Sequence, residues 1–195
     1  PKGSGADILQ LKVATVNCTG WGSLKNSWLK QTDVHVLLVQ EHHMLDSQLN
    51  AASRWLLARG WHSLFAGAMP GSGAGTSAGV AILARSALGL YPPPGGSLIY
   101  PHRAIAGILH LPGGSPIMVC SVYLHDGQNL SEANLEILGK LGATTSSSGL
   151  PVVVGGDFNF QPDVMLASEV AERTNTRIVC TGRGTCDTTG GTKGE

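Results

Sequence analysis

Apolar and polar residues alternate along several short segments of the chain, as they do in half-buried strands. Other segments are almost continuously apolar, which is typical of strands buried on both faces. The predicted strands are residues 11–17, 34–40, 79–85, 104–111, 116–124, 151–155 and 177–180. Two of these flank Pro112-Gly113-Gly114, and turn residues between apolar runs predict a β-hairpin there.

Helical spacing of apolar residues predicts four helices, and capping residues mark two of their starts. The predicted helices are residues 21–30, 47–58, 131–143 and 163–173. Asp46 is a plausible N-cap for the second helix and Ser131 for the third, while Gly60 would stop the second. Hairpin-joined strands with helices between some of them predict a single α+β domain over residues 1–195, built as a layered sandwich.

Polar side chains stand where predicted strands end. Asn17 ends the first strand, Glu41 follows the second, and Asp157 and Asn159 follow the apolar run PVVVG. Asp157 and Asn159 are two positions apart, so an extended segment projects them from the same face. Mg²⁺ prefers hard oxygen ligands, retains several waters and is usually held by one or two carboxylates. This pattern indicates a metal-dependent phosphoryl-transfer site.

Each of these residues also has an ordinary structural explanation. An Asn after a strand is commonly a turn residue, and a Glu at a strand end is commonly solvated. Gly-Asp-Phe-Asn at residues 156–159 could be no more than an Asx turn. Because all three segments place such residues where a predicted strand ends, a shared site is favoured over three unrelated turns.

Composition narrows the functional classes. The 195 residues carry a formal net charge of +0 without a Lys/Arg run, so the electrostatic signature of tight non-specific nucleic-acid binding is missing. The four cysteines form no CxxC pair, which argues against zinc-knuckle or redox motifs. The sequence shows no targeting or membrane-spanning segment, and an intracellular protein is favoured. The chain begins without Met, so a fragment of a longer protein is expected.

Five segments together resemble the endonuclease/exonuclease/phosphatase superfamily, whose members include abasic-site endonucleases and retroelement endonucleases. The matching segments are VATVNCTG (residues 13–20), VLLVQEHHM (36–44), GVAILAR (79–85), CSVYLHDG (120–127) and VVVGGDFNFQP (152–162). The last is the most specific. The resemblance implies the deoxyribonuclease-like fold, with a two-layer β-sandwich flanked by helices in four layers, α/β/β/α.

The resemblance also implies roles for individual residues. Glu41 would be the main ligand of Mg²⁺ or Mn²⁺, with Asn17 assisting at the metal or phosphate. Asp157 would activate or orient the attacking water, and Asn159 would hold the scissile phosphate. Tyr123 would contact phosphate, as in the abasic-site branch. The substrate-binding candidates are Arg103 and Asp126.

The implied activity is divalent-metal-dependent hydrolysis of phosphodiesters, most plausibly by an endonuclease acting on nucleic acid, with DNA favoured over RNA. The family's closing strands carry an Asp and then an Asp-His pair. No His follows His125, and Asp187 is a poor substitute, so we expect the chain to lack the final strands and to be inactive or weak alone.

Two alternatives within the same fold remain open, and two other motifs are tested by the residues themselves. A decayed domain of the same fold would bind or scaffold without catalysis, and a phospholipid or inositol phosphatase would share the same core. Gly75-Thr76-Ser77-Ala78-Gly79 fits the GxSxG pattern of serine hydrolases, but a strand rather than a helix is predicted after it, and no His follows His125. Adjacent His42 and His43 lack zinc-ligand spacing.

Overall fold

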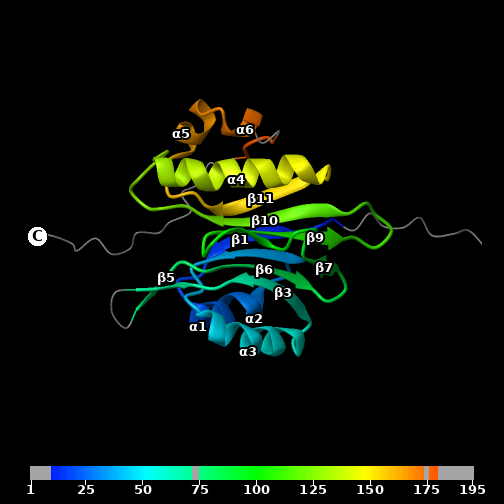
Figure 1. The fold of residues 1–195 in the computed structure, drawn as a ribbon. Coiled ribbons are helices and arrows are strands. Elements are labelled where there is room, and N and C mark those ends of the chain that lie inside the picture. Colours follow the sequence, from blue (N-terminus) through cyan, green and yellow to red (C-terminus); the bar gives the residue numbers. More distant parts are fainter. Residues whose placement is uncertain (1–9, 72–74, 174–175, 180–195) are drawn as a thin grey trace, which may run out of the picture.

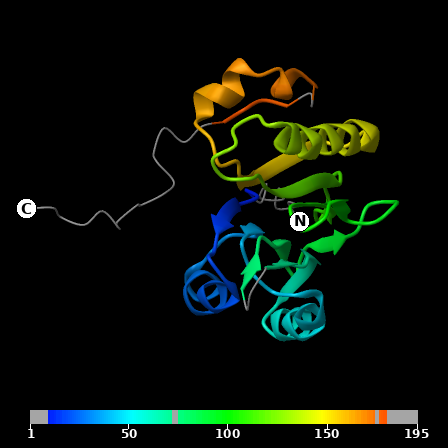
Figure 2. The ribbon, with the colours of Figure 1, turned by 60° about the vertical axis from the view of Figure 1, so that its left-hand side comes forward.

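Two β-sheets pack face to face, and helices cover the outer face of each in a computed structural model that describes residues 10–71, 75–173 and 176–179. Figures 1 and 2 show the four layers, with α1 to α3 on one outer face and α4 on the other. The predicted α+β class and the α/β/β/α layering are confirmed.

The first sheet combines one parallel and two antiparallel strand pairs. Its order is β1-β2-β6-β3, in which β1 and β2 run parallel. Its strands are β1 (Val13–Asn17), β2 (Val36–Gln40), β3 (Trp61–Ala66) and β6 (Val80–Arg85). The helical elements on its outer face are α1 (Trp21–Ser23), the π-helical turn η1 (Leu24–Trp28), α2 (Leu29–Gln31) and α3 (Asp46–Leu57).

The second sheet is also mixed, with order β11-β10-β9-β7 and with β8 paired to β9. β10 and β11 run parallel, whereas β9 and β10 form the antiparallel hairpin that the Pro-Gly-Gly turn predicted. Its strands are β7 (Gly89–Tyr91), β8 (Leu98–Tyr100), β9 (Ala104–His110), β10 (Ile117–Tyr123) and β11 (Val152–Asp157). The remaining elements are β4 (Met69–Pro70), β5 (Thr76–Ser77), α4 (Glu132–Ser148), α5 (Pro162–Ala167) and α6 (Val170–Arg173).

Apolar side chains fill each of the three spaces between layers. Leu38 and Ile82 from the first sheet meet Ile105 from the second, all at 1% exposure or less. Burying a side chain of this size contributes about 1.5–3 kcal/mol, so this central layer holds the two sheets together. Ile137 of α4 belongs to a second cluster above the second sheet, and Leu56 of α3 to a third below the first.

A polar bridge crosses the interface between the sheets. The Gln40 side-chain amide donates to the Ser121 hydroxyl at 2.9 Å, and that hydroxyl donates to the Val39 carbonyl at 2.9 Å. Thr15 donates to the Gln40 amide oxygen at 3.2 Å. Because Gln40 and Ser121 are both buried, these hydrogen bonds satisfy groups that would otherwise be costly to desolvate.

Local details differ from the sequence predictions at several places, and the short strands β4, β5, β7 and β8 were not predicted. Asp46 is the first residue of α3 rather than its cap; Leu45 precedes the helix, and its N–H donates to the Gln48 side chain at 2.8 Å. The first predicted helix contains the π-helical turn η1. The helix predicted over 163–173 is divided between α5 and α6 at Ser168. The strand predicted over 177–180 is wrong for residues 177–179, and Cys180 lies outside the described residues. β3 was not predicted at all.

Candidate active site

Four strands end at one edge of the sandwich, and the strand register explains why. In the first sheet Asn17 pairs with Gln40 at the ends of parallel strands β1 and β2. In the second sheet Tyr123 pairs with Asp157 at the ends of parallel strands β10 and β11. Parallel neighbours present their carboxyl ends together. We call the group Asn17, Glu41, Tyr123 and Asp157 the acidic edge.

A side-chain hydrogen bond joins the two sheets at this edge. The Asn17 amide nitrogen donates to Asp157 Oδ2 at 2.9 Å, and the Thr19 N–H donates to Asn17 Oδ1 at 3.1 Å. The other Asp157 oxygen, Oδ1, accepts from the Asn159 N–H at 3.2 Å. Asn17 therefore orients the Asp157 carboxylate in this arrangement, and its own amide oxygen is engaged by the backbone.

Asn159 is held in an uncommon backbone conformation. Its φ is 54°, in the left-handed region that Asn tolerates better than most residues, and its amide nitrogen donates to the Leu124 carbonyl at 2.8 Å. Gly156 lies close against the neighbouring strand, where a Cβ would be 2.3 Å from the Val122 oxygen. These two contacts explain why Gly and Asn are required around Asp157 in the segment Gly-Asp-Phe-Asn.

Glu41 turns out of β2 with a φ of 57°. Its carboxylate interacts with the Tyr123 phenol, whose pKa it raises, and lies 3.5 Å from His43 Nε2. The Glu41 side chain is 20% exposed, so it is partly shielded but still accessible. His43 in turn is oriented by its Nδ1, which lies 2.9 Å from the Thr76 carbonyl oxygen.

Tyr123 connects the two carboxylates. Burial raises the pKa of its phenol, and the Glu41 hydrogen bond and charge raise it further, with a smaller contribution from Asp157. The Arg103 guanidinium lies over the Tyr123 ring, 5.0 Å from its centroid, and opposes that pKa rise. Tyr123 therefore remains a protonated hydrogen-bond donor beside both carboxylates at neutral pH.

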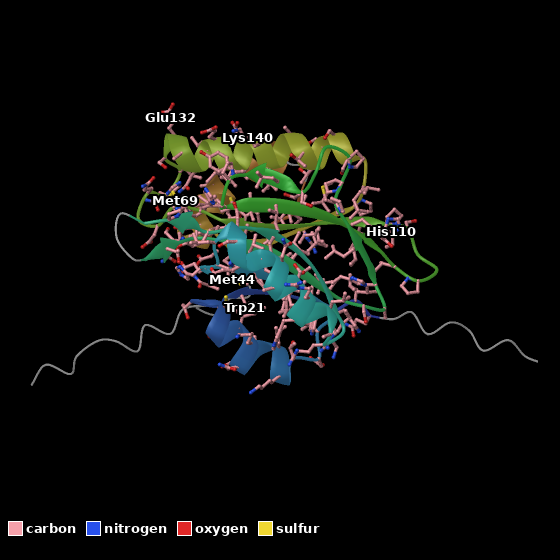
Figure 3. All side chains as sticks on the ribbon, turned by 60° about the horizontal axis from the view of Figure 1, so that its bottom comes forward. Trp21, Met44, Met69, His110, Glu132 and Lys140 are labelled. Atoms are coloured by element: carbon pink, nitrogen blue, oxygen red, sulfur yellow. The ribbon has the colours of Figure 1, made fainter. Side chains whose placement is uncertain are left out.

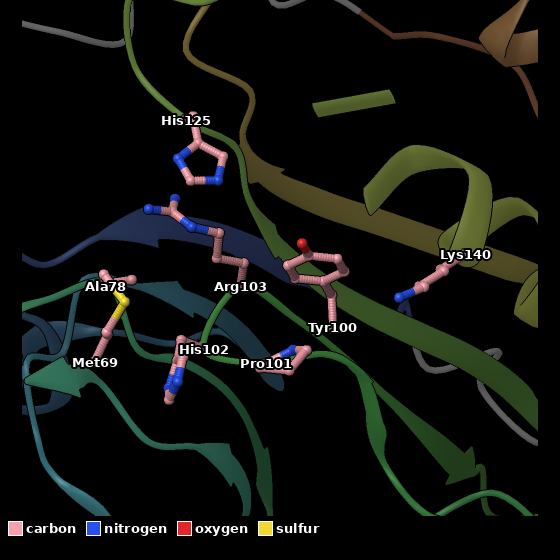
Figure 4. Close-up of a pocket in the computed structure, with 8 residues that line it drawn as sticks. All are labelled: Met69, Ala78, Tyr100, Pro101, His102, Arg103, His125 and Lys140. Atoms are coloured by element: carbon pink, nitrogen blue, oxygen red, sulfur yellow. The ribbon is translucent and has the colours of Figure 1, made fainter. Parts of the chain in front are cut away.

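A cavity of about 350 Å³ adjoins the acidic edge through Arg103. Figure 4 shows the Arg103 guanidinium directed toward the His125 ring, with Tyr100 and Lys140 farther along the cavity. The His125 backbone is fixed by Asn134, whose buried side chain accepts from the His125 N–H at 2.8 Å and donates to its carbonyl at 3.1 Å. Desolvation and the Arg103 charge lower the pKa of His125.

The donor set fits a hard divalent cation with few protein ligands. Across residues 10–71, 75–173 and 176–179, no three His, Cys, Asp or Glu side chains gather into a metal-binding group. Mg²⁺ needs only one or two carboxylates because water supplies its other ligands. Glu41, partly exposed and held by Tyr123, meets that requirement, and the Asp157 carboxylate lies across the same edge.

The structure brings Asn17, Glu41, Tyr123, Asp157 and Asn159 together, as the sequence predicted, with Arg103 next to them. Asp126 stands apart: it is exposed in the turn after β10 and makes no side-chain hydrogen bond or ion pair with a described residue. His43 was missed, because Glu41 and His43 leave the strand with positive φ values and so turn toward each other.

The structure does not support the serine-hydrolase motif or a reactive cysteine among the described residues. Ser77 lies in β5 and is followed by strand β6, so the helix that a nucleophile elbow requires is not there. Cys18 and Cys120 are buried, and burial raises their pKa values to about 11 and about 12, which makes reactive thiolates unfavourable. Cys180, Cys186 and Asp187 lie outside the described residues.

Comparisons with known proteins identify the family and agree with the fold. The model of the endonuclease/exonuclease/phosphatase family matches residues 26–191. Among solved structures, ANGEL2, a 2′,3′-cyclic phosphatase solved with adenosine-2′,3′-vanadate, is 21% identical with a TM-score of 0.60, covering 83% of this chain and 57% of its own. The abasic-site endonuclease LMAP from Leishmania major is 15% identical with a TM-score of 0.59, covering 84% of this chain and 66% of its own.

A third similar structure is the endonuclease domain of TRAS1, a telomere-specific non-LTR retrotransposon. It is 12% identical with a TM-score of 0.50, and the match covers 79% of this chain and 61% of that domain. No curated protein matches the chain. The chain thus spans 57% of the length of ANGEL2 and a similar share of TRAS1. None of the helices among the described residues is long and apolar enough to cross a membrane.

Proposed function

The chain belongs to the endonuclease/exonuclease/phosphatase family, and we propose that it is a divalent-metal-dependent phosphodiesterase that hydrolyses nucleic acid. One observation carries this proposal. Two carboxylates from different sheets, Glu41 and Asp157, approach Tyr123, which pairs with Asp157 at the strand ends and whose phenol pKa both carboxylates raise. Phosphoryl transfer depends on positioning and charge stabilisation, and this arrangement supplies both.

Each residue has a distinct role in the proposed reaction. Glu41 would hold the cation, which when bound would neutralise charge developing on the phosphoryl oxygens. Asp157, held in place by Asn17, would accept a proton from the water that attacks phosphorus. A P–O bond to that water forms, the P–O bond to the leaving alkoxide breaks, and the alkoxide takes a proton from solvent. Asn159 and Tyr123 would orient the phosphate.

The adjoining cavity supports a substrate larger than phosphate alone. Its volume of about 350 Å³ lies at the low end for small-ligand sites, and the Arg103 guanidinium stands between it and the acidic edge. Arginine binds phosphate through two parallel hydrogen bonds. We infer that Arg103 contacts a phosphate next to the scissile bond and that the neighbouring nucleoside occupies the cavity. DNA is the favoured substrate, with RNA as the second candidate.

The metal site can be tested without an activity assay. Mn²⁺ binding, followed by electron paramagnetic resonance and by calorimetry, is expected to weaken at least about tenfold in Glu41→Ala, since a carboxylate ligand is lost. The matched control is Glu132→Ala, an exposed carboxylate at the start of α4. Equal Mn²⁺ affinity in wild type and Glu41→Ala would remove Glu41 from the site.

Hydrolysis is measured on DNA and RNA oligonucleotides of one sequence, each with Mg²⁺ or with EDTA. The proposal expects cleavage that EDTA abolishes and that is faster on DNA. Faster cleavage of RNA, or opening of a 2′,3′-cyclic phosphate, would reassign the substrate within the same reaction class. Oligonucleotide binding with neither cleavage nor Mn²⁺ binding would instead indicate a non-catalytic binding domain of this fold.

A further inference from the structure

A second cavity, of about 360 Å³, lies on the outer side of the first sheet. Four cationic side chains line it together with two indoles, drawn from η1, α2, β3, β6 and the end of α3. These residues are Lys25, Lys30, Arg59, Arg85, Trp55 and Trp61. We call this group the basic pocket. Figure 3 labels Trp21 in the adjoining helical layer and Lys140 in α4, and the two lie on opposite outer layers of the molecule.

Both guanidinium groups lie over aromatic rings. The Arg59 guanidinium lies 3.8 Å from the Trp55 ring centroid, and the Arg85 guanidinium lies 4.0 Å from that of Trp61. Arg85 also donates to the Thr32 carbonyl at 2.8 Å. Stacked arginines lose little conformational freedom when they bind, so these two donors are oriented in advance.

The π-helical turn contributes the third cation. Within η1, Lys25 places its ammonium group 5.6 Å from the Trp21 ring centroid and 5.8 Å from that of Trp55. π-Helical turns are rare and frequently occur at functional sites. Here the turn brings Lys25 to the same indole that carries Arg59, which concentrates two charges at one ring.

The pocket has no neutralising carboxylate among the described residues. None of the four cations forms an ion pair there: the ion pairs of the described chain join Lys12 to Asp33, His43 to Glu41 and Lys140 to Glu136. Asp33 is the acid on the neighbouring loop, and its pKa is lowered by Lys12. In a chain of formal net charge +0, this is a local excess of positive charge.

The strand register places the basic pocket far from the acidic edge. Arg85 ends β6 beside the amino end of β2, where its N–H donates to the His35 carbonyl, whereas Glu41 follows Gln40 at the other end of β2. Six residue steps from 35 to 41, at about 3.3 Å each, separate the two by roughly 20 Å. A group bound in the basic pocket therefore does not contact the hydrolytic site.

We propose that the basic pocket binds a phosphate-bearing ligand at a site separate from the hydrolytic centre. The proposal does not depend on the proposed function. Two planar guanidiniums and two ammonium groups converging on about 360 Å³ match a compact, multiply charged anion. An acidic peptide spreads single charges along its length, and an apolar ligand would find the indole faces already covered. The phosphate can belong to a free nucleotide or to a nucleic-acid backbone.

Tryptophan fluorescence reports on the layer that contains this pocket. The sequence has four Trp residues, Trp21, Trp28, Trp55 and Trp61, and all of them lie in α1, η1, α3 or β3. Inorganic pyrophosphate, adenosine monophosphate and a short single-stranded oligonucleotide are titrated in EDTA, with polyglutamate as the non-phosphate polyanion. Calorimetry provides a second measurement that does not depend on the indoles.

The decisive variant is Lys25→Gln/Arg59→Gln. Loss of two charge-assisted contacts is expected to weaken phosphate binding at least about tenfold. Arg54→Gln, which removes an exposed charge from α3 outside the pocket, should change it by less than about twofold. Asp157→Asn should leave it unchanged, which separates this site from the hydrolytic one. Circular dichroism checks that each variant is folded.

Several outcomes decide the proposal. Similar binding of pyrophosphate and of the oligonucleotide supports a free phosphate ligand, whereas oligonucleotide binding alone, steeply weakened by salt, supports a nucleic-acid backbone. No response to any phosphate probe, unchanged affinity in the double variant, or tighter binding of polyglutamate than of every phosphate probe would overturn it.

Discussion

The acidic edge and the basic pocket occupy opposite ends of the first sheet and gather side chains of opposite charge. At the acidic edge, Glu41 and Asp157 approach a common phenol and are held by hydrogen-bond donors from Tyr123 and Asn17. In the basic pocket, Arg59 and Arg85 are held by indole rings, without a described carboxylate nearby. We propose that one end receives a cation and the other an anion.

The difference also concerns how each region is supported. The acidic edge rests on strand ends whose register is fixed by the sheets, so its geometry depends on sheet packing. The basic pocket rests on contacts between cationic and indole side chains, contributed by the helical layer and by β3 and β6 at the other end of the sheet. Changes in sheet packing should therefore damage the first region and spare the second.

The largest expected effect is on hydrolysis. Asp157→Asn keeps the size of the side chain but removes the proposed proton acceptor, so cleavage should fall by at least about a hundredfold, or about 2.7 kcal/mol of transition-state stabilisation. Asp163→Asn, an exposed position on α5, is the matched control. Cleavage by Asp157→Asn within a few-fold of wild type would show that the two ends do not differ as proposed.

The next effect concerns pH. Burial lowers the pKa of His42 from 6.5 to about 4. His42 is protonated below about pH 6.5 in the unfolded chain, but only near pH 4 in the folded chain. The free energy of unfolding is therefore highest above pH 6.5 and falls by about 3 kcal/mol as the pH drops toward 4. In His42→Gln, the urea midpoints at pH 7.5 and pH 4.5 should lie closer together than in wild type. In His110→Gln, an exposed position on β9, the difference between the two midpoints should stay as in wild type.

Sheet packing itself is tested by Gly156→Ala. Its Cβ would lie 2.3 Å from the Val122 backbone oxygen, so the strands β10 and β11 must separate, at a cost of about 1–3 kcal/mol. Gly139→Ala, in α4 with no atom within 4 Å of the added Cβ, should be neutral or slightly stabilising. Hydrolysis should fall with Gly156→Ala while pyrophosphate binding is retained; parallel loss of both would contradict the comparison.

The smallest expected effect is on the stability contributed by the basic pocket. Arg59→Gln removes a cation–π contact at an exposed site, which costs about 0.5–1 kcal/mol. Arg54→Gln should change the urea midpoint less, because Arg54 lies over no described ring. A larger loss from Arg59→Gln than from Gly156→Ala would mean that the stacked surface, and not the sheet register, supports the fold in this region.

The sequence predicted the acidic edge well because its signals are local. A strand has a period of two and a definite end, so Asn17, Glu41 and Asp157 could each be placed at a strand terminus from a few residues. Their meeting was predicted from the resemblance to a family, and parallel pairing of β1 with β2 and of β10 with β11 is the structural reason for it. His43 was missed because the backbone after Gln40 adopts positive φ at Glu41 and His43, which no residue type at those positions indicates.

The basic pocket and β3 were missed for different reasons. The pocket collects side chains from several distant segments, and no two of them form a recognisable motif. Trp61–Ala66 is buried at its ends and only partly buried between them, so its pattern lacks the alternation expected of a strand. The cap of α3 was misplaced by one residue because a backbone N–H, that of Leu45, makes the capping contact instead of an Asp side chain.

The buried Gln40–Ser121 contact has a consequence for how this enzyme class can vary. Gln40 directly precedes Glu41, and Ser121 lies two residues before Tyr123. If one sheet shifted by a single residue, the Gln40 amide and the Ser121 hydroxyl would be buried in an apolar interior without hydrogen-bond partners. The contact therefore fixes how the two sheets are aligned, and with them Glu41 and Tyr123. Surface loops can therefore change in length and sequence without moving the two carboxylates, whereas a Gln40 variant would misalign them without touching substrate.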